Sequence, residues 1–204
     1  MSAAASRTDA GYQVLGSTER FAGPVFRVVT DDVLMPGGER ADRDYVLHLG
    51  AVGVVAVDEH DRVVLVRQYR HALHRVIWEL PAGLIDVAGE PLVDAAAREL
   101  AEEADLEAGQ YDLLADVHTS PGCSNELIRL FLARDLTPVP DGARYARTHE
   151  EADLEVHRVP LDEAVEMALT GQITNAACLI GVLAAARVRD RGWAGLRPPD
   201  TPLP

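Results

Sequence analysis

Three glutamates in the segment 98–103 (RELAEE) have a spacing that suits metal binding. In a helix, Glu99 and Glu103 would lie on one face, with Glu102 about one hundred degrees round the axis. Like charges four residues apart cost helix stability, so a cation that neutralises them would explain their presence. Mg²⁺ is commonly bound by one or two protein carboxylates together with substrate phosphates. A solvated acidic helix face is the alternative interpretation of the spacing alone.

The residues around the glutamates predict a helix. Pro91 suits the first helical turn, where its missing N–H costs nothing, and Asp94 would lie near the positive end of the helix dipole. Apolar residues recur at helical spacing: Leu92, Ala95, Ala96, Leu100 and Ala104. An apolar strand over 76–80 and a Gly-containing loop over 81–83 come just before the helix. The order is therefore strand, loop and acidic helix.

This order and spacing resemble the box of the Nudix hydrolases, G-x5-E-x7-R-E-U-x-E-E-x-G-U, in which U is a bulky apolar residue. The matching residues are Gly83, Glu90, Arg98, Glu99, Leu100, Glu102, Glu103 and Leu106. Six residues rather than five separate Gly83 from Glu90, which leaves the role of Glu90 open. Asp105 replaces the second Gly, at a position after the helix where a left-handed backbone is common and Asp is tolerated better than most residues. Neither departure alters the E-x-x-E-E face.

The resemblance implies an α/β fold, the Nudix α/β/α sandwich with a mixed β-sheet, here preceded by an N-terminal strand segment. It also implies a hydrolase with Mg²⁺ as cofactor and Mn²⁺ as a possible substitute. The implied metal ligands are the Ala82 carbonyl and the carboxylates of Glu99, Glu102 and Glu103, of which Glu99 and Glu103 are the main ones. Arg98 would orient carboxylates through its planar fork; a surface salt bridge is the alternative. Bound metal ions neutralise and orient the diphosphate and lower the pKa of water.

A second pattern narrows the substrate. The turn over 119–126 (TSPGCSNE) places Pro121 fifteen residues after Leu106. This resembles the ADP-ribose pyrophosphatase subgroup, which carries a Pro at about this distance in a turn of the form S/A-P-G-x-[ST]-x-E. Residues 68–70 (QYR) and 78–83 (WELPAG) also resemble the subgroup, although Ser-Pro-Gly by itself is only a rigid turn. The resemblance implies that ADP-ribose, or a close ADP-sugar, is hydrolysed to AMP and ribose 5-phosphate.

The general base is expected near the end of a long loop. A base must lie within reach of the attacking water, and in the ADP-ribose subgroup it is a Glu from a late loop. Here the aperiodic segment 137–150 precedes a predicted strand over 154–159. We expect Glu151 to be the base, with Glu150 as the second choice. Without the resemblance, such a pair would be read as solvated surface.

Five further residues are candidates for substrate binding: Arg70, Trp78, Glu79, Pro121 and Glu126. Arg70 follows a strand and would hold a phosphate. Trp78 would stack on adenine, or belong to the apolar core. Glu126 would accept hydrogen bonds from ribose hydroxyls, or cap the following strand.

Composition limits the class of protein. The chain has 204 residues, 48% hydrophobic and 25% charged, which suits one globular domain. A formal net charge of −14 argues against nucleic acid as the general partner. We expect no membrane partner, since no apolar run approaches the roughly 18 residues of a membrane span. The N-terminus lacks the apolar core of a signal peptide, and the two cysteines are expected to be reduced thiols. These features predict a cytoplasmic enzyme.

The expected organisation has three parts. An N-terminal arm with strands covers 1–44 and is expected to exchange between the subunits of a homodimer, as in the subgroup; the Nudix domain covers 45–190; an extended tail covers 191–204. The expected strands are 26–34, 43–49, 51–57, 62–69, 76–80, 111–117, 127–133 and 154–159, with a hairpin at 58–61 and late helices over 161–170 and 174–189.

Two alternatives remain beside hydrolysis of ADP-ribose. One is a Nudix hydrolase acting on another nucleoside diphosphate derivative or on oxidised nucleoside triphosphates. The other is a non-catalytic, nucleotide-sensing module, against which the intact R-E-U-x-E-E pattern argues.

Overall fold

A computed structural model describes residues 10–147 and 153–204. The chain divides into two compact units. The first comprises the chain up to Gly50 together with His118–Glu126, and the second comprises Ala51–Val117 and the chain from Leu127 to the end.

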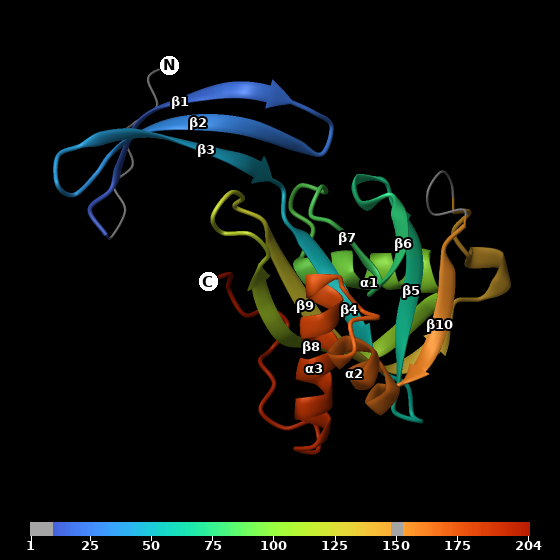
Figure 1. The fold of residues 1–204 in the computed structure, drawn as a ribbon. Coiled ribbons are helices and arrows are strands. Elements are labelled where there is room, and N and C mark those ends of the chain that lie inside the picture. Colours follow the sequence, from blue (N-terminus) through green and yellow to red (C-terminus); the bar gives the residue numbers. More distant parts are fainter. Residues whose placement is uncertain (1–9, 148–152) are drawn as a thin grey trace. The chain divides into compact units, whose positions relative to one another are not determined.

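The first unit contains a three-stranded antiparallel sheet in the order β1-β2-β3 (Figure 1). Its strands are β1 (Gln13–Ala22), β2 (Phe26–Leu34) and β3 (Arg40–His48). The predicted strand over 26–34 is confirmed, and the one over 43–49 begins three residues earlier. Strand β1 was not predicted, because register shifts between Val14 and Gly16 and between Glu19 and Phe21 interrupt the alternation on which a sequence prediction depends.

The second unit contains two sheets, ordered β7-β4-β9-β8 and β10-β5-β6. The strands are β4 (Ala51–Ala56), β5 (Arg62–Arg70), β6 (Arg75–Glu79), β7 (Ala82–Leu84), β8 (Leu106–His118), β9 (Leu127–Pro138) and β10 (Glu155–Pro160). Strand β4 pairs parallel with β9 and antiparallel with β7, so the larger sheet is mixed, as expected.

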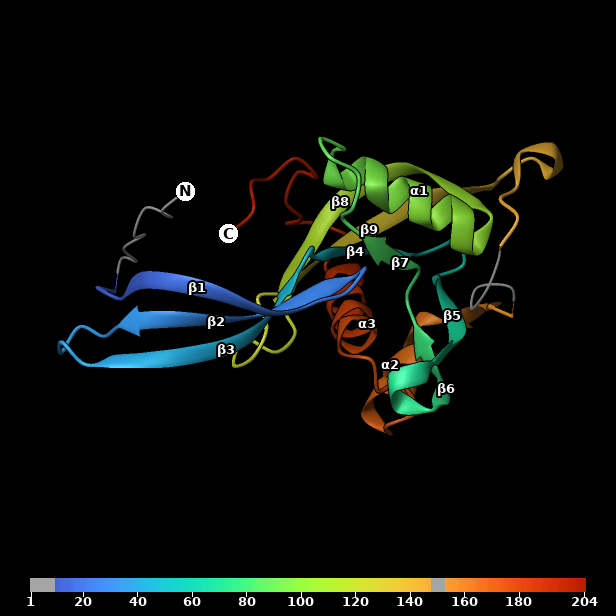
Figure 2. The same cartoon turned by 90° about the horizontal axis from the view of Figure 1, so that it is seen from above.

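Helices α1 (Leu92–Ala104) and α3 (Ala176–Arg189) cover the two faces of this larger sheet, and α2 (Leu161–Leu169) packs on α3 and on β5 and β10 of the smaller sheet. Short 3-10 turns occupy His71–Leu73 and Asp141–Ala143. Helix α1 contacts β4, β7 and β9, whereas α3 contacts β4, β9 and β6 and also packs on α2. Figure 2 shows α1 and α3 on opposite sides of β4 and β9. The predicted α/β/α sandwich is confirmed.

Each face of the sheet has its own apolar core. The α1 side joins small helix residues to strand residues, among them Ala95, Ala96, Leu100, Val52, Val54 and Phe131. The α3 side joins Cys178, Val182 and Ala185 to strand residues such as Val55, Leu65 and Leu130. Helix α3 lies close to the sheet because Gly181 has no side chain: a Cβ there would lie 2.8 Å from Val55 Cγ2.

The hairpin predicted at 58–61 is wrong in its pairing. The turn itself is tight, since the Asp58 N–H donates to the Arg62 carbonyl over 3.0 Å and Val57 forms an isolated bridge with Val63. Beyond it the strands separate, because β4 pairs with β7 and β9 while β5 pairs with β10 and β6. Strand β4 is buried throughout, and a fully buried strand has no polar alternation that would identify its partners.

The segment predicted as a loop over 81–83 is partly a strand. Ala82–Leu84 forms β7, which pairs antiparallel with the first half of β4. A proline can occupy the start of a strand, where no ladder hydrogen bond from its nitrogen is needed. Pro81 therefore did not exclude a strand that begins at Ala82.

The left-handed conformation expected at Asp105 is confirmed. Asp105 ends α1 with φ 55° and ψ 37°, and its N–H donates to the carbonyls of Ala101 and Leu100.

The end of the chain lies against β8 and β9. The Leu113 N–H donates to the Arg197 carbonyl over 2.9 Å, and the buried Arg129, paired with Asp116, donates to the Thr201 carbonyl over 2.6 Å.

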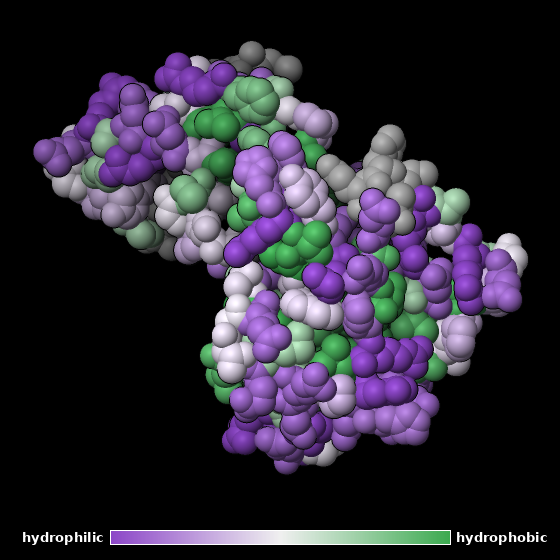
Figure 3. Space-filling model, turned by 45° about the vertical axis from the view of Figure 1, so that its right-hand side comes forward, coloured by the Kyte–Doolittle hydropathy of each residue, from purple (hydrophilic) through white to green (hydrophobic). Residues whose placement is uncertain are grey.

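No helix in the described parts of the chain is long and apolar enough to cross a membrane. Figure 3 shows one face of the molecule, on which hydrophilic and hydrophobic residues are interspersed.

Candidate active site

Two carboxylates of α1 converge on strand β7. The Ala82 N–H donates to Glu103 Oε2 over 2.8 Å. The Glu99 carboxylate lies against Gly83, where an added Cβ would be only 2.1 Å from Glu99 Cδ. Glu99 is 8% exposed and Glu103 is 6% exposed, which is unusual for charged side chains. The prediction that these two glutamates share a helix face is confirmed.

The packing of α1 explains how charged residues come to be buried there. Ala95 and Ala96 are fully buried one turn before Glu99, and Leu100 is 0% exposed. Small side chains on this face let the helix approach the sheet closely, so the next residues on the same side meet β7. The absence of a side chain at Gly83 supplies the space that the Glu99 carboxylate fills.

Arg98 links the other box glutamates. Its guanidinium donates to Glu99 Oε1 over 2.5 Å and to both oxygens of Glu90 over 3.2 and 3.0 Å. A further ion pair joins it to Glu102 at 3.7 Å. The hydrogen bond with Arg98 lowers the pKa of Glu90, and the same bond raises the pKa of Arg98 against the opposing effect of burial. The insertion before Glu90 therefore does not remove it from the carboxylate cluster.

The residues around β7 fit a hard divalent cation in chemical type. Glu99 and Glu103 offer carboxylate oxygens from a buried position, and oxygen ligands are what such cations prefer. Within the described ranges, no three His, Cys, Asp or Glu side chains are grouped closely enough to hold one ion. The guanidinium of Arg98, bonded to both Glu99 and Glu90, contributes the positive charge among these carboxylates.

A second polar cluster joins Arg70, Glu79 and Asn175. Glu79 is 4% exposed, and its carboxylate accepts hydrogen bonds from Arg70 and from Asn175 Nδ2, with Arg70 Nη2 at 2.6 Å and Asn175 at 2.9 Å. Arg70 and Glu79 were predicted separately as substrate-binding residues, and their pairing was not predicted. A phosphate held by Arg70 would share its guanidinium with Glu79.

Sequence reasoning missed Asn175. Its Oδ1 also accepts the Cys178 N–H over 2.9 Å and so caps the start of α3. An Asn just before an apolar helix is a typical N-cap signal, which would have found the capping role but not the bond to Glu79. Burial, with a smaller contribution from Glu79, raises the pKa of the Cys178 thiol to about 12, so this cysteine stays protonated.

Trp78 belongs in part to the core. It is half-buried and packs against the apolar cluster on the α3 side. The Arg67 guanidinium lies 5.2 Å from the centroid of its ring, and the His157 ring lies edge-on with centroids 4.9 Å apart. The core packing of Trp78 is thus observed, and its stacking on adenine stays a prediction.

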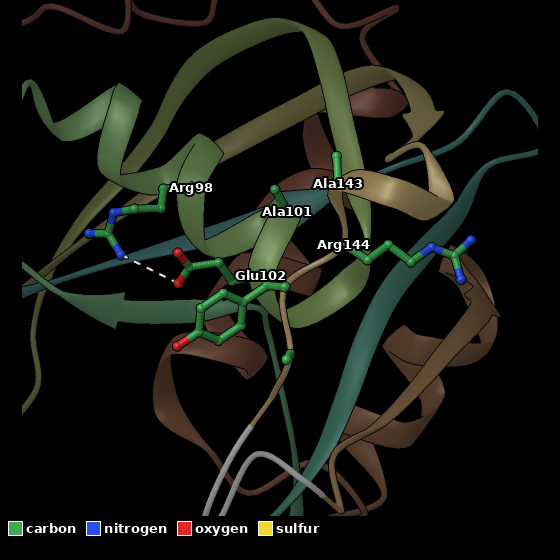
Figure 4. Close-up of a pocket in the computed structure, with 7 residues that line it drawn as sticks. Arg98, Ala101, Glu102, Ala143 and Arg144 are labelled. Atoms are coloured by element: carbon green, nitrogen blue, oxygen red, sulfur yellow. Dashed lines mark ion pairs between the residues drawn. The ribbon is translucent and has the colours of Figure 1, made fainter.

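A hollow of about 550 Å³ lies between α1 and the segment after β9. Arg98, Ala101 and Glu102 line it from the helix, and 143–146 line it from the segment opposite (Figure 4). Two residues of the Nudix-like box thus face a cavity of the size that small ligands occupy.

Pro121 and Glu126 lie in the first unit, within the turn that was expected there. The Ser120 carbonyl accepts the N–H groups of Cys123 and Ser124 over 3.0 and 2.9 Å, which makes the turn rigid. Glu126 accepts a hydrogen bond from Thr119 Oγ1 over 2.5 Å.

The structure groups the predicted site residues in two sets: Ala82, Arg98, Glu99, Glu102 and Glu103 around β7 and α1, and Arg70 with Glu79. The expected bases, Glu150 and Glu151, lie outside the described residues.

The chain is similar to proteins of known family and fold. The family profile of the NUDIX domain matches residues 47–178. The chain is 43% identical over 190 residues to the ADP-ribose pyrophosphatase of Mycobacterium tuberculosis, covering 93% of this chain and 90% of that protein. It is 35% identical over 162 residues to the methanol dehydrogenase activator of Bacillus methanolicus, covering 79% of this chain and 85% of that protein. The crystal structure of an ADP compounds hydrolase matches with a TM-score of 0.75 at 21% identity, covering 92% of this chain and 99% of that one, which shows a shared fold.

The α/β/α sandwich, in which buried carboxylates of an acidic helix meet a short strand, is that of a class of pyrophosphohydrolases that generally need a divalent metal. The chain belongs to the Nudix family, and it is a Nudix pyrophosphohydrolase.

Proposed function

We propose that the chain hydrolyses the diphosphate of ADP-ribose, or of a close ADP-sugar, to AMP and ribose 5-phosphate. The observation that carries this proposal is the 43% identity to an ADP-ribose pyrophosphatase across nine-tenths of both chains. The buried carboxylate pair at β7 supports it, because these carboxylates would hold a divalent cation, and such a cation would neutralise the charge by which a diphosphate repels nucleophiles.

In the proposed site Glu99 and Glu103 are the main ligands of Mg²⁺, for which Mn²⁺ would substitute. The carbonyl of Ala82 and the carboxylate of Glu102 complete the set. When bound there, such an ion would supply the positive charge that neutralises the diphosphate and would lower the pKa of water. Support comes from the Ala82–Glu103 hydrogen bond, which places both residues at one point.

Arg98 has a positioning role in this proposal. Its planar fork holds Glu99 and Glu90 at once, and a bidentate arginine fixes geometry as well as charge. With Arg98 removed, the Glu99 carboxylate would lose its 2.5 Å partner while still buried.

The proposed base is Glu151, with Glu150 as the second choice. The base takes a proton from water as the water oxygen bonds to one phosphorus, and the bridging P–O bond breaks to release AMP and ribose 5-phosphate. Residues 143–146, which precede both glutamates in the sequence, line the hollow beside Glu102, and this supports the choice of the late segment.

Substrate recognition in the proposal uses Arg70 for a phosphate, oriented by the carboxylate of Glu79. Trp78 stacks on adenine. Its ring contacts the polar side chains of Arg67 and His157 as well as the apolar core. Pro121 and Glu126 belong to the turn that resembles the ADP-ribose subgroup, and Glu126 accepts ribose hydroxyls.

The proposed assembly is a cytoplasmic homodimer in which residues 1–44 exchange between subunits, the Nudix domain covers 45–190 and the tail covers 191–204. Apolar side chains on the first unit support a contact with a second copy: Phe21 is 53% exposed and Leu49 is 55% exposed. Phe26 and Leu49 also line a hollow of about 380 Å³. A symmetric partner is the commonest occupant of such surfaces in soluble enzymes.

The test is a substrate panel with the purified full-length protein and Mg²⁺. The panel holds ADP-ribose, other ADP-sugars, GDP-mannose, a diadenosine polyphosphate and 8-oxo-dGTP, with products separated by chromatography. We expect ADP-ribose to have the highest kcat/KM among them. Far faster hydrolysis of 8-oxo-dGTP or of the diadenosine compound would contradict the proposed substrate, and no hydrolysis of any compound would favour a non-catalytic module.

A further inference from the structure

Both ends of the segment after β9 are attached to one residue, Asp105. At the near end, the Val139 N–H donates to the Asp105 carbonyl over 2.9 Å. At the far end, Arg147 Nη2 donates to Asp105 Oδ2 over 2.7 Å, and Arg147 Nε donates to the Glu102 carbonyl over 2.9 Å. The segment between them, 140–146, is therefore closed into a loop at the C-terminal end of α1.

These contacts are stronger than an ordinary surface ion pair. The side chains of Arg147 and Asp105 are only 20% and 26% exposed, which limits screening by solvent. The Glu102 carbonyl belongs to the last turn of α1, whose carbonyls have no partner within the helix. A cation is also favoured there by the helix dipole. One guanidinium thus binds a carboxylate and a helix end together.

The pairing with Arg147 explains why residue 105 is an aspartate. Its backbone is left-handed, with φ 55°, a conformation that Gly adopts freely and that costs other residues about 1 kcal/mol. The Nudix box that this chain resembles has Gly at this position. Asp is present here despite the cost, and its carboxylate is the partner of Arg147.

The closed loop also forms part of the hollow beside the box. Residues 143–146 line it opposite Arg98 and Glu102. Glu102 therefore has two relations to this loop. Its side chain lines the same hollow as residues 143–146, and its carbonyl accepts the hydrogen bond from Arg147 Nε.

We propose that Asp105 and Arg147 are a positioning pair for the hydrolytic reaction. The pair holds the loop 140–146 against the end of α1, so the wall of the hollow keeps its place beside Glu102. The catalytic consequence rests on the proposed function, whereas the anchoring of the loop does not.

The variant that tests the pair is Asp105→Gly. Glycine keeps the left-handed backbone without the strain of about 1 kcal/mol, which offsets the loss of the bond to Arg147, so the global stability should change little. Arg147→Ala removes the same bond from the other side. Arg147→Lys keeps one charged donor and should restore part of the activity. The matched control is Arg189→Ala, because Arg189 is also 20% exposed and also pairs with an Asp, Asp162, at 2.6 Å.

Two measurements on these full-length variants separate the possible outcomes. For ADP-ribose with Mg²⁺ we expect kcat to fall about tenfold in Asp105→Gly and Arg147→Ala, which is less than the roughly 100-fold cost of a full 1 Å misplacement of a catalytic group. The unfolding midpoint of Asp105→Gly should change little, and Arg189→Ala should keep the kcat of the unaltered protein. Hydrogen exchange of the 143–146 amides should be faster in both pair variants than in the control.

Unchanged kcat in Asp105→Gly, or a loss of kcat that only follows a loss of stability, would overturn the positioning role. Unchanged exchange at 143–146 would overturn the anchoring itself. If the unaltered protein does not hydrolyse ADP-ribose, the proposed function fails, and faster exchange in the pair variants would still establish the anchoring.

Discussion

Replacing Gly83 with Ala should displace the Glu99 carboxylate while leaving the fold intact. A Cβ at Gly83 would lie 2.1 Å from Glu99 Cδ and 2.2 and 2.4 Å from its two oxygens. Real Cβ contacts essentially never fall below 3.0 Å, so the carboxylate must move by nearly 1 Å at the least. That movement would break its 2.5 Å contact with Arg98. A displacement of about 1 Å in a catalytic constellation can cost about 100-fold in rate.

The assay is kcat/KM for ADP-ribose over a range of Mg²⁺ concentrations, with thermal unfolding measured in parallel. We expect kcat/KM to fall about 100-fold and the Mg²⁺ requirement to rise. Gly109→Ala is the control, because Gly109 is also a strand glycine with a close neighbour, Asp135 Cβ at 3.2 Å, but lies outside the carboxylate cluster. Gly83→Ala protein that folds and retains full kcat/KM at limiting Mg²⁺ would refute the placement of Glu99.

Two further predictions concern the base and the stability of the fold. Glu151→Gln should lower kcat strongly and change KM little, with Glu150→Gln the milder lesion in the same steady-state assay; the reverse order would move the base by one residue. Asp58→Ala should lower the free energy of unfolding by about 2 kcal/mol in urea titrations near pH 7, because the 0% exposed carboxylate accepts the backbone N–H and side-chain donors of Arg62. Burial alone would raise the pKa of Asp58, yet these hydrogen bonds lower it below 3.8, so its stabilisation is full above about pH 3.8 and is lost as the pH falls through the lowered folded-state value. An equal effect of Asp58→Ala near pH 7 and near pH 2 would contradict that assignment.

Local patterns predicted most elements of the fold but not their partners. The strand over 26–34 and the acidic helix have clear periodicity and punctuation, and both are where the sequence placed them. Pairing depends on contacts between distant segments, so the separation of β4 and β5 into different sheets was not visible in the turn between them. Strand β1 was missed because its bulges interrupt the alternation.

The site was predictable where one helix determines it. The i, i+4 spacing of Glu99 and Glu103 fixes their common face whatever the rest of the chain does. The Arg70–Glu79–Asn175 cluster joins three elements, and no local pattern reports such a meeting. The same holds for Arg147, whose partners lie 42 and 45 residues earlier in the chain.

In the proposed reaction, this Nudix enzyme splits ADP-ribose at its diphosphate with a metal held by the α1 carboxylates. The most direct measurement is the product stoichiometry with Mg²⁺ for the unaltered protein and for Glu103→Gln, whose fold is checked by thermal unfolding. We predict one AMP and one ribose 5-phosphate for each ADP-ribose consumed, no reaction after the metal is chelated, and loss of most of the turnover in folded Glu103→Gln. Other products, or near-normal turnover of Glu103→Gln at saturating Mg²⁺, would contradict the claim.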